Sequence, residues 1–313
     1  MICFKYFSRS IRKACKDQIT RTLTSQPATD AKAIESSEEK CIVVDRIGAV
    51  MTIGINRPEK RNCLDTKTAL SLANALDSFD HDSEALVGIL HGIGGNFCAG
   101  YDLHEIAQYT GDSEDNVPHF GPLCNRTSLS NKPLIGVMVG FTIGVGFELS
   151  LMCDLRICEH TTVMGLLNRR FGIPMLCGGT VRLPAMIGYS RALDLILTGR
   201  SITGEEAYNW GLCNQLVQCG SGLGRGISLA QSLTKFPQRT LLADRRSAHA
   251  ATFGINQIEE ALQFEKDNAS HLLLEEGVAG AKKFVNGIGR HGKSYNLTKM
   301  DRISFKRLSD DML

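Results

Sequence analysis

Two glycine-rich segments are the parts of this sequence most suited to chemistry. They comprise residues 94–103 and 140–149, and each follows an apolar, β-branched run and leads into a helical pattern. The first N–H groups of a helix have no acceptor inside it, so they are available to a bound anion. Two such turns brought together would bind one carbonyl oxygen from two sides. We therefore expect an oxyanion hole built from main-chain N–H groups, suited to the negative charge on a thioester oxygen.

Glu148 is the candidate acid or base beside these turns. It lies in an otherwise apolar stretch, residues 145–153, in the first turn of the expected helix. The helix dipole favours a carboxylate there, while burial would raise its pKa toward neutrality. Such a carboxylate is suited to moving a proton next to a carbonyl held in the hole. A plain helix N-terminal carboxylate with no chemical role is the alternative, and position alone does not separate the two.

The elements that must position these residues alternate between strand and helix patterns. Apolar residues at helical spacing predict a helix over 65–79. Strand-like runs are expected at 41–44, 49–55, 85–90, 134–139, 156–158, 164–167 and 214–217. The first two runs flank Gly48 and predict a β-hairpin, whereas the third and fourth lead into the glycine segments. This alternation indicates an α/β architecture with right-handed crossovers.

From residue 190 onward the sequence is mainly helical. Ser190 is expected to cap a helix over 191–197. Thr203 and Glu206 have the spacing of a capping box. Longer helical patterns follow at 221–234 and 255–283. We expect the last of these to cover the core or to mediate self-association.

The chain divides into four expected parts. Residues 1–29 are basic and rich in hydroxyl side chains, with no acid before Asp17. This composition is typical of a mitochondrial transit peptide and predicts a location in the matrix; a disordered basic tail is the alternative. Residues 30–40 form a linker, residues 41–250 the core, and residues 251–313 a C-terminal helical region.

Composition excludes several classes of protein. A net charge of +2 with 22% charged residues favours neither a nucleic-acid partner nor an acidic surface. No apolar run reaches the roughly 18–20 residues of a membrane span. The 11 cysteines are scattered without a CxxC pair, which favours buried reduced thiols over a disulfide framework. The spacing of His and Cys predicts no metal site.

Six motifs in register resemble those of the crotonase (enoyl-CoA hydratase/isomerase) family. They lie at residues 56–62 (Asn-Arg-Pro-Glu-Lys-Arg-Asn), 95–103, 144–148, 153–157, 178–183 and 197–200. The resemblance runs over residues 41–290. It implies an α/β fold in which stacked ββα units form a spiral core followed by C-terminal helices. It also implies a homotrimer, or a hexamer made as a dimer of trimers.

The resemblance implies an acyl-CoA thioester as the substrate. The backbone N–H groups of Tyr101 and Val145, which follow Gly100 and Gly144, would form the oxyanion hole. Glu148 falls on the family's first catalytic glutamate and would move a proton at the α or γ carbon. No organic cofactor is implied beyond the coenzyme A of the substrate.

The same resemblance implies where coenzyme A would bind. Lys60 and Arg61 would meet its phosphates, although a solvated loop pair is the alternative for these two residues. The backbone of Cys98 and Ala99 would border the adenine. For the acyl group we expect an apolar pocket, with candidates Phe141, Phe147, Met175 and Leu176.

One departure from the family pattern concerns its second glutamate. Counting back from Gly172-Ile173-Pro174 places that position at Leu167, with Asn168 beside it. Leucine cannot transfer a proton, so hydration by two carboxylates is in doubt, whereas isomerisation, dehydration or decarboxylation can proceed with one. A protein that binds acyl-CoA without turning it over, or a noncatalytic partner in an assembly, is the alternative function.

Overall fold

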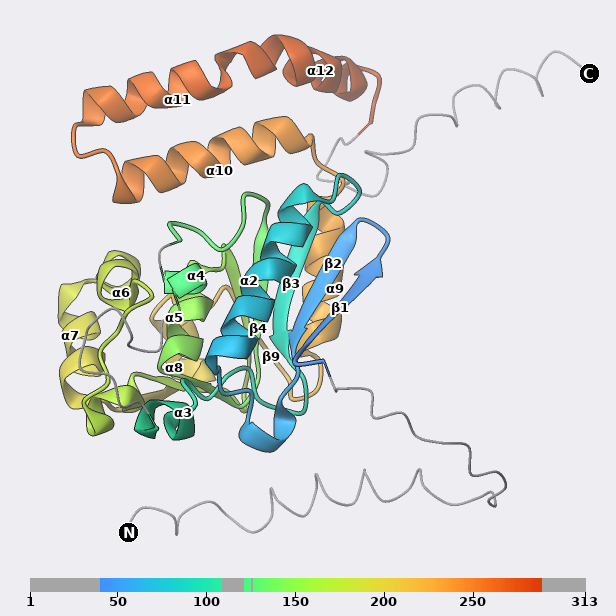
Figure 1. The fold of residues 1–313 in the computed structure, drawn as a ribbon. Helices are drawn as coiled ribbons and strands as arrows, with labels where there is room; N and C mark the ends of the chain where they lie inside the picture. The colour runs from blue at the N-terminus through green and yellow to red at the C-terminus, as the bar shows by residue number, and fades with distance from the viewer. Residues whose placement is uncertain (1–39, 109–120, 125, 289–313) are drawn as a thin grey trace, which may run out of the picture. The chain divides into compact units, whose positions relative to one another are not determined.

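A six-stranded sheet forms the centre of the fold. The computed structural model describes residues 40–108, 121–124 and 126–288 (Figure 1). The sheet contains β1 (Ile42–Ile47), β2 (Val50–Ile55), β3 (Val87–Gly92), β4 (Leu134–Met138), β6 (Leu155–Glu159) and β9 (Gln215–Val217), in the order β1-β2-β3-β4-β6-β9. β1 and β2 form the expected antiparallel hairpin, and the other neighbours are parallel. The parallel pairing confirms crossover connections on an α/β core.

A second sheet lies next to the first glycine segment. It joins β5 (Phe141–Ile143), β7 (Val163–Gly165) and β8 (Ser201–Thr203), in the order β5-β7-β8. β7 is shorter than the strand expected at 164–167, because the chain turns into a 3₁₀ helix, η3, at Leu167–Phe171. This turn brings Leu167 and Asn168 toward the glycine segments.

Helices cover both faces of the large sheet. α2 (Thr66–His81) begins at Asp65, whose carboxylate accepts a hydrogen bond from the Thr68 N–H, and it buries an apolar stripe that includes Leu72, Leu76 and Phe79. α9 (Gly222–Leu233) packs through Ala230 on a separate apolar cluster on the opposite face. Figure 1 shows the sheet between these two helices.

The remaining helices surround the glycine segments. They are η1 (Pro58–Lys60), α3 (Leu103–Ala107), α4 (Gly121–Cys124), α5 (Val145–Met152), α6 (Gly179–Ile187), α7 (Tyr189–Thr198) and α8 (Gly204–Asn209). The cap expected at Ser190 is wrong: α7 begins at Tyr189, after Gly188 in a positive-φ turn. The capping interaction expected at Thr203 is confirmed, since its hydroxyl accepts a hydrogen bond from the Glu206 N–H.

The C-terminal region is a helical hairpin. It consists of α10 (Gln238–Phe253), α11 (Ile258–Leu272), the π-helical segment η4 (Leu273–Gly277) and α12 (Val278–Val285). The sequence pattern did not single out α10, because it buries only Ala243 and Ser247. The division expected between residues 250 and 251 falls inside α10.

The expected targeting segment and residues 289–313 lie outside the described residues. No helix among those described is long and apolar enough to cross a membrane.

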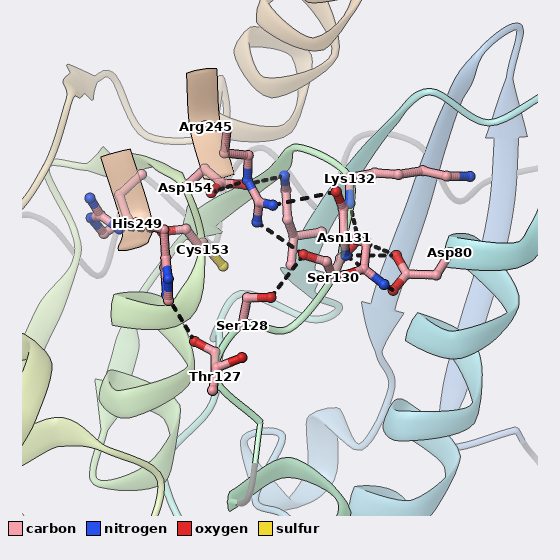
Figure 2. Close-up of polar contacts among 12 residues, drawn as sticks. Asp80, Thr127, Ser128, Ser130, Asn131, Lys132, Cys153, Asp154, Arg245 and His249 are labelled. Carbon is pink, nitrogen blue, oxygen red and sulfur yellow. Dashed lines mark hydrogen bonds and ion pairs between the residues drawn. The ribbon is translucent and has the colours of Figure 1, made fainter. Parts of the chain in front are cut away.

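A polar network joins α10 to the core (Figure 2). Arg245 donates to Asp154 Oδ1 over 2.7 Å and to the Ser130 carbonyl over 2.9 Å. Asp154 Oδ2 in turn accepts the Leu134 N–H at the start of β4, over 2.8 Å. Asp154 pairs with Arg245 rather than with its sequence neighbour Arg156. Arg156 is buried and donates to backbone carbonyls, among them Leu212 O at 2.6 Å.

Replacement of Arg245 by alanine is expected to destabilise the protein by about 1–3 kcal/mol, because it leaves partly buried acceptors unpaired. Arg225→Ala is the matched control, since this exposed guanidinium bonds only a side-chain amide, that of Gln215, among the hydrogen bonds of the described chain. Urea unfolding measures both. Equal midpoints for the two variants would show that the network does not stabilise the fold.

Candidate active site

The two glycine turns lie side by side. The Cys98 N–H donates to the Phe141 carbonyl, and the Ile143 N–H donates to the Cys98 carbonyl, each over 2.9 Å. Gly144 has a φ of +55°, and a Cβ added there would lie 3.7 Å from the Gly100 Cα. The structure therefore brings together the two segments that the sequence analysis singled out.

Close packing fixes the start of α5 against the first turn. A Cβ on Gly146 would lie 2.4 Å from the Cys98 carbonyl oxygen, so no larger residue fits there without a shift of backbone. Val145 is the first residue of α5. Its N–H has no acceptor within the helix. Helix packing thus holds a backbone donor in place beside Gly100.

Tyr101 and Val145 line one small cavity of about 70 Å³. The lining residues are Ala99, Gly100, Tyr101, Leu103, Ile143, Gly144, Val145, Leu167, Asn168, Phe171 and Ile173. The apolar wall therefore differs from the one expected. Phe147 is fully buried in the core and Phe141 lies under Arg61, while η3 and the residues after it contribute the wall.

Glu148 is buried beside this cavity and held by backbone donors. Its Oε1 accepts hydrogen bonds from the N–H groups of Cys177 and Gly179, each over 3.0 Å, and only 1% of the residue is exposed. Burial raises the pKa of Glu148, and the backbone hydrogen bonds oppose this shift only in part. The sequence did not reveal these donors, because they come from the loop before α6 and from the first residue of α6, about thirty residues away from Glu148.

The Glu148 carboxylate also acts on Tyr101. Burial is the main cause of a raised pKa at the Tyr101 phenol, and the charges of nearby Cys177, Cys124 and Glu148 add to it. Glu148 itself is not among the described residues that line the cavity. The structure thus brings Tyr101 and Val145 to one cavity, and Glu148 lies close enough to Tyr101 for its charge to affect the phenol.

Asn168 supplies a polar atom that faces the glycine turns. Its Nδ2 donates to the Ile173 carbonyl over 2.8 Å, but Oδ1 is buried and has no hydrogen-bond partner in the described chain. A Cβ on Gly144 would lie 3.7 Å from this oxygen. Leu167 also lines the cavity. At the expected second-glutamate position, the group capable of hydrogen bonding is therefore the Asn168 amide.

A larger, open cavity of about 470 Å³ adjoins the small one. Its lining includes Lys60 and Arg61, and both cavities share Ala99, Tyr101 and Leu103. The two cations are not equivalent. Lys60 Nζ forms an ion pair with Asp102 Oδ2 at 2.9 Å, whereas the Arg61 guanidinium lies 5.3 Å from the centre of the Phe141 ring. Part of the Lys60 charge is thus offset within the protein.

Cys98 and Ala99, the two residues expected to border the adenine of coenzyme A, differ in their placement. Ala99 lines both cavities. Cys98 instead lies in the core, fully buried, with its backbone N–H and carbonyl bonded to the second glycine segment. Burial raises the pKa of the Cys98 thiol to about 12. Its placement does not support the expected contact with adenine, because pairing with β5 occupies its backbone.

Comparison with known proteins identifies the family of this chain. The sequence model of the family "Enoyl-CoA hydratase/isomerase" matches residues 45–286. The Enoyl-CoA hydratase domain-containing protein 2, mitochondrial, of Bos taurus is 35% identical over 263 residues, covering 82% of this chain and 83% of the relative. A carnitinyl-CoA dehydratase of Salmonella arizonae is 35% identical over 193 residues, covering 61% and 73%.

Solved structures show the same fold. The crystal structure of an enoyl-CoA hydratase from Bacillus anthracis superposes with a TM-score of 0.73 at 29% identity, covering 79% of this chain and 96% of that one. The fold is therefore that of the crotonases, as the motifs predicted. The chain belongs to the enoyl-CoA hydratase/isomerase family.

Proposed function

We propose that this protein is a lyase or isomerase that acts on acyl-CoA thioesters by stabilising an enolate. The observation that carries the proposal is the convergence of Tyr101 and Val145 on one cavity, with the buried carboxylate of Glu148 close enough to affect the Tyr101 phenol. The backbone N–H groups of Tyr101 and Val145 bind the thioester oxygen. They stabilise the charge that develops there when a proton leaves the α carbon.

Glu148 accepts that proton and returns it at the α or γ carbon. Burial favours its neutral form, so a proton taken from carbon is held at low cost. Because Glu148 does not line the small cavity, proton transfer requires a local rearrangement that brings its carboxylate within reach of the acyl chain. The coenzyme A portion occupies the larger cavity, where Lys60 and Arg61 face its phosphates. No cofactor takes part in this mechanism besides the coenzyme A of the substrate.

Asn168 favours a reaction that involves water or a substrate hydroxyl. Its buried, unpartnered Oδ1 accepts a hydrogen bond but cannot act as a base. We therefore place Asn168 as the group that orients a water or a β-hydroxyl, with Glu148 as the one carboxylate that moves protons. Relatives named enoyl-CoA hydratase and carnitinyl-CoA dehydratase support this class of reaction.

Asn168→Ala is expected to slow hydration or dehydration about three- to tenfold, which corresponds to one hydrogen bond of about 0.5–1.5 kcal/mol. Exchange of the α proton should change by less than about twofold, because the oxyanion hole and Glu148 remain. Thr142→Val is the matched control, since Thr142 Oγ1 is the other buried, unpartnered side-chain oxygen of the described residues. Equal losses in both reactions would contradict the role given to Asn168.

A noncatalytic acyl-CoA-binding protein is the second candidate function. Two features favour it: Leu167 lacks a carboxylate, and Glu148 is almost fully buried. Incubation of the purified protein with crotonyl-CoA and 3-hydroxybutyryl-CoA, followed by chromatography of the thioesters, separates the two. Turnover supports the enzyme. Binding by calorimetry with no turnover across a wider acyl-CoA panel supports the binder.

We also propose a homotrimer or hexamer in the mitochondrial matrix. Large apolar side chains stay exposed on the C-terminal helices, including Ile258 at 64% and Leu274 at 77%, and a second subunit would cover them. The mitochondrial name of one relative and the basic composition of residues 1–29 support the location. Light scattering and imaging of a fluorescent fusion test the two proposals separately.

A further inference from the structure

Two cysteines that are far apart in the sequence meet beside Glu148. Cys124 is the last residue of α4, and Cys177 lies in the loop before α6. Their Sγ atoms are 2.7 Å apart. Since a disulfide bond is about 2.05 Å long, the sulfur atoms need to approach by only about 0.7 Å to form one.

The surroundings connect this thiol pair to the candidate active site. The Tyr101 hydroxyl lies 3.8 Å from Cys177 Sγ and 4.0 Å from Cys124 Sγ. The backbone N–H of Cys177 is one of the donors that hold Glu148 Oε1, at 3.0 Å. A single residue therefore carries one of the two sulfurs and positions the proposed base.

The two thiols differ in reactivity. Cys124 is only partly buried, whereas Cys177 is fully buried. The hydrogen bond from the Cys177 thiol is the main cause of a lowered pKa at Cys124, and the same bond raises the pKa of Cys177. Because the thiolate is the attacking species, Cys124 is the thiol expected to react first with an oxidant.

We propose that Cys124 and Cys177 are a modification site at which a low-molecular-weight disulfide reversibly oxidises the pair to an intramolecular disulfide. The Cys124 thiolate attacks one sulfur of the oxidant and expels a thiolate, which leaves a mixed disulfide on Cys124. Cys177 then loses its proton and attacks Cys124 Sγ, and the second small thiol departs. The two protein thiols are oxidised, and one small disulfide is reduced to two thiols.

Disulfide formation also changes the site that holds Glu148. The bond links the loop containing Cys177 to the end of α4 and moves Cys177 Sγ toward Cys124. The Cys177 N–H, which donates to Glu148 Oε1, is expected to shift with it. This consequence rests on the proposed function, because it requires Glu148 to move protons. Displacement of catalytic groups by about 1 Å can cost about 10²-fold in rate, so a smaller shift is expected to lower kcat about three- to tenfold.

Another pair of neighbouring thiols provides an internal comparison. The neighbouring Cys213 thiol, together with burial, raises the pKa of Cys158. Both are buried in the core, at 0% and 4% exposure, and neither is among the described residues that line the two candidate cavities. A small disulfide cannot reach them without unfolding, so they are expected to stay reduced under conditions that oxidise Cys124 and Cys177.

Peptide mapping of the full-length protein tests the proposal. Reduced protein is incubated with oxidised glutathione, its remaining thiols are blocked with N-ethylmaleimide, and its peptides are analysed by mass spectrometry. We expect a cross-linked peptide joining Cys124 to Cys177, lighter by two hydrogens and reversed by dithiothreitol. It should be absent from Cys124→Ser and Cys177→Ser but present in Cys41→Ser, the matched control. No cross-link in the wild type, or a link between Cys158 and Cys213 alone, would overturn the proposal.

Activity of the mapped samples tests the connection to Glu148. Oxidation should lower kcat in the wild type and in Cys41→Ser but not in Cys124→Ser. An unchanged kcat in fully cross-linked wild type would overturn the proposed effect on the site. The two failures are distinguishable. If the reduced protein shows no turnover, the proposed function is wrong, while the peptide map still reports whether the disulfide forms.

Discussion

Replacement of Glu148 by glutamine is expected to lower kcat by at least about 10²-fold, the usual contribution of a positioned acid or base. Acyl-CoA affinity should change by less than about twofold, because the oxyanion donors remain. Glutamine has the same shape, and its Oε1 can still accept the N–H groups of Cys177 and Gly179. Rapid-quench kinetics and calorimetry measure the two quantities.

Glu159→Gln is the matched control for that variant. Glu159 is also buried, at 2% exposure, and its Oε1 also accepts a backbone N–H, that of Gly222 at 2.9 Å. Glu159 is the last residue of β6 and is not among the described residues that line the two candidate cavities. Its replacement should leave kcat unchanged. Turnover by Glu148→Gln at the level of this control would contradict the mechanism.

The pH dependence of the wild type should reflect the same group. Burial raises the pKa of Glu148 above its ordinary value of 4.5. For removal of the α proton the carboxylate must be ionised, so kcat/KM should fall as the pH drops through this raised pKa. The acidic limb is therefore expected above pH 4.5 and should disappear in the residual activity of Glu148→Gln. Titration of initial rates at constant ionic strength measures it.

Replacement of Val145 by proline is expected to lower kcat about 10²–10³-fold, as the loss of one oxyanion donor does elsewhere. Proline has no N–H, and it is tolerated at the first position of a helix, where that group has no acceptor within the helix. Val145 occupies this first position in α5. The residue before it, Gly144, has a positive φ, which glycine adopts without strain. The substitution therefore removes one hydrogen bond to the substrate oxygen with little change of fold.

Val145→Ala separates loss of the donor from loss of packing. Val145 is buried, so both variants lose part of its apolar contacts, but only proline removes the N–H. Alanine should keep kcat within about threefold, while circular dichroism shows native helix content in both variants. Equal kcat in Val145→Pro and Val145→Ala would mean that this N–H does not stabilise the transition state.

Local chemistry accounts for what the sequence predicted well. The glycine turns predicted Gly100 and Gly144, because few other residues adopt their positive φ values. Gly144 precedes the first residue of α5 as expected, but Gly100 lies before a β-bridge between Tyr101 and Leu64, and α3 begins only at Leu103. The cap at Thr203 depends on residues three apart and was also predictable. The hairpin around Gly48 likewise follows from a local pattern.

Contacts between distant segments account for what the sequence missed. The backbone donors to Glu148 come from residues 177 and 179, and nothing local to Glu148 identifies them. Counting along the sequence placed only Leu167 at the second-glutamate position. The 3₁₀ helix η3 brings the neighbouring Asn168 amide close to Gly144 too, and both residues line the small cavity. The meeting of Cys124 and Cys177 depends on the packing of α4, and so it could not be read from spacing.

Exchange of deuterium into acyl-CoA tests enolate formation in this site most directly. Purified protein is incubated with crotonyl-CoA and butyryl-CoA in deuterated water, and the position of deuterium is determined by NMR and mass spectrometry. We expect incorporation at the α or γ carbon by the wild type and at least about 10²-fold slower incorporation by Glu148→Gln. Tight binding of these thioesters by the wild type, with no exchange, hydration or double-bond migration, would contradict enolate chemistry in this site.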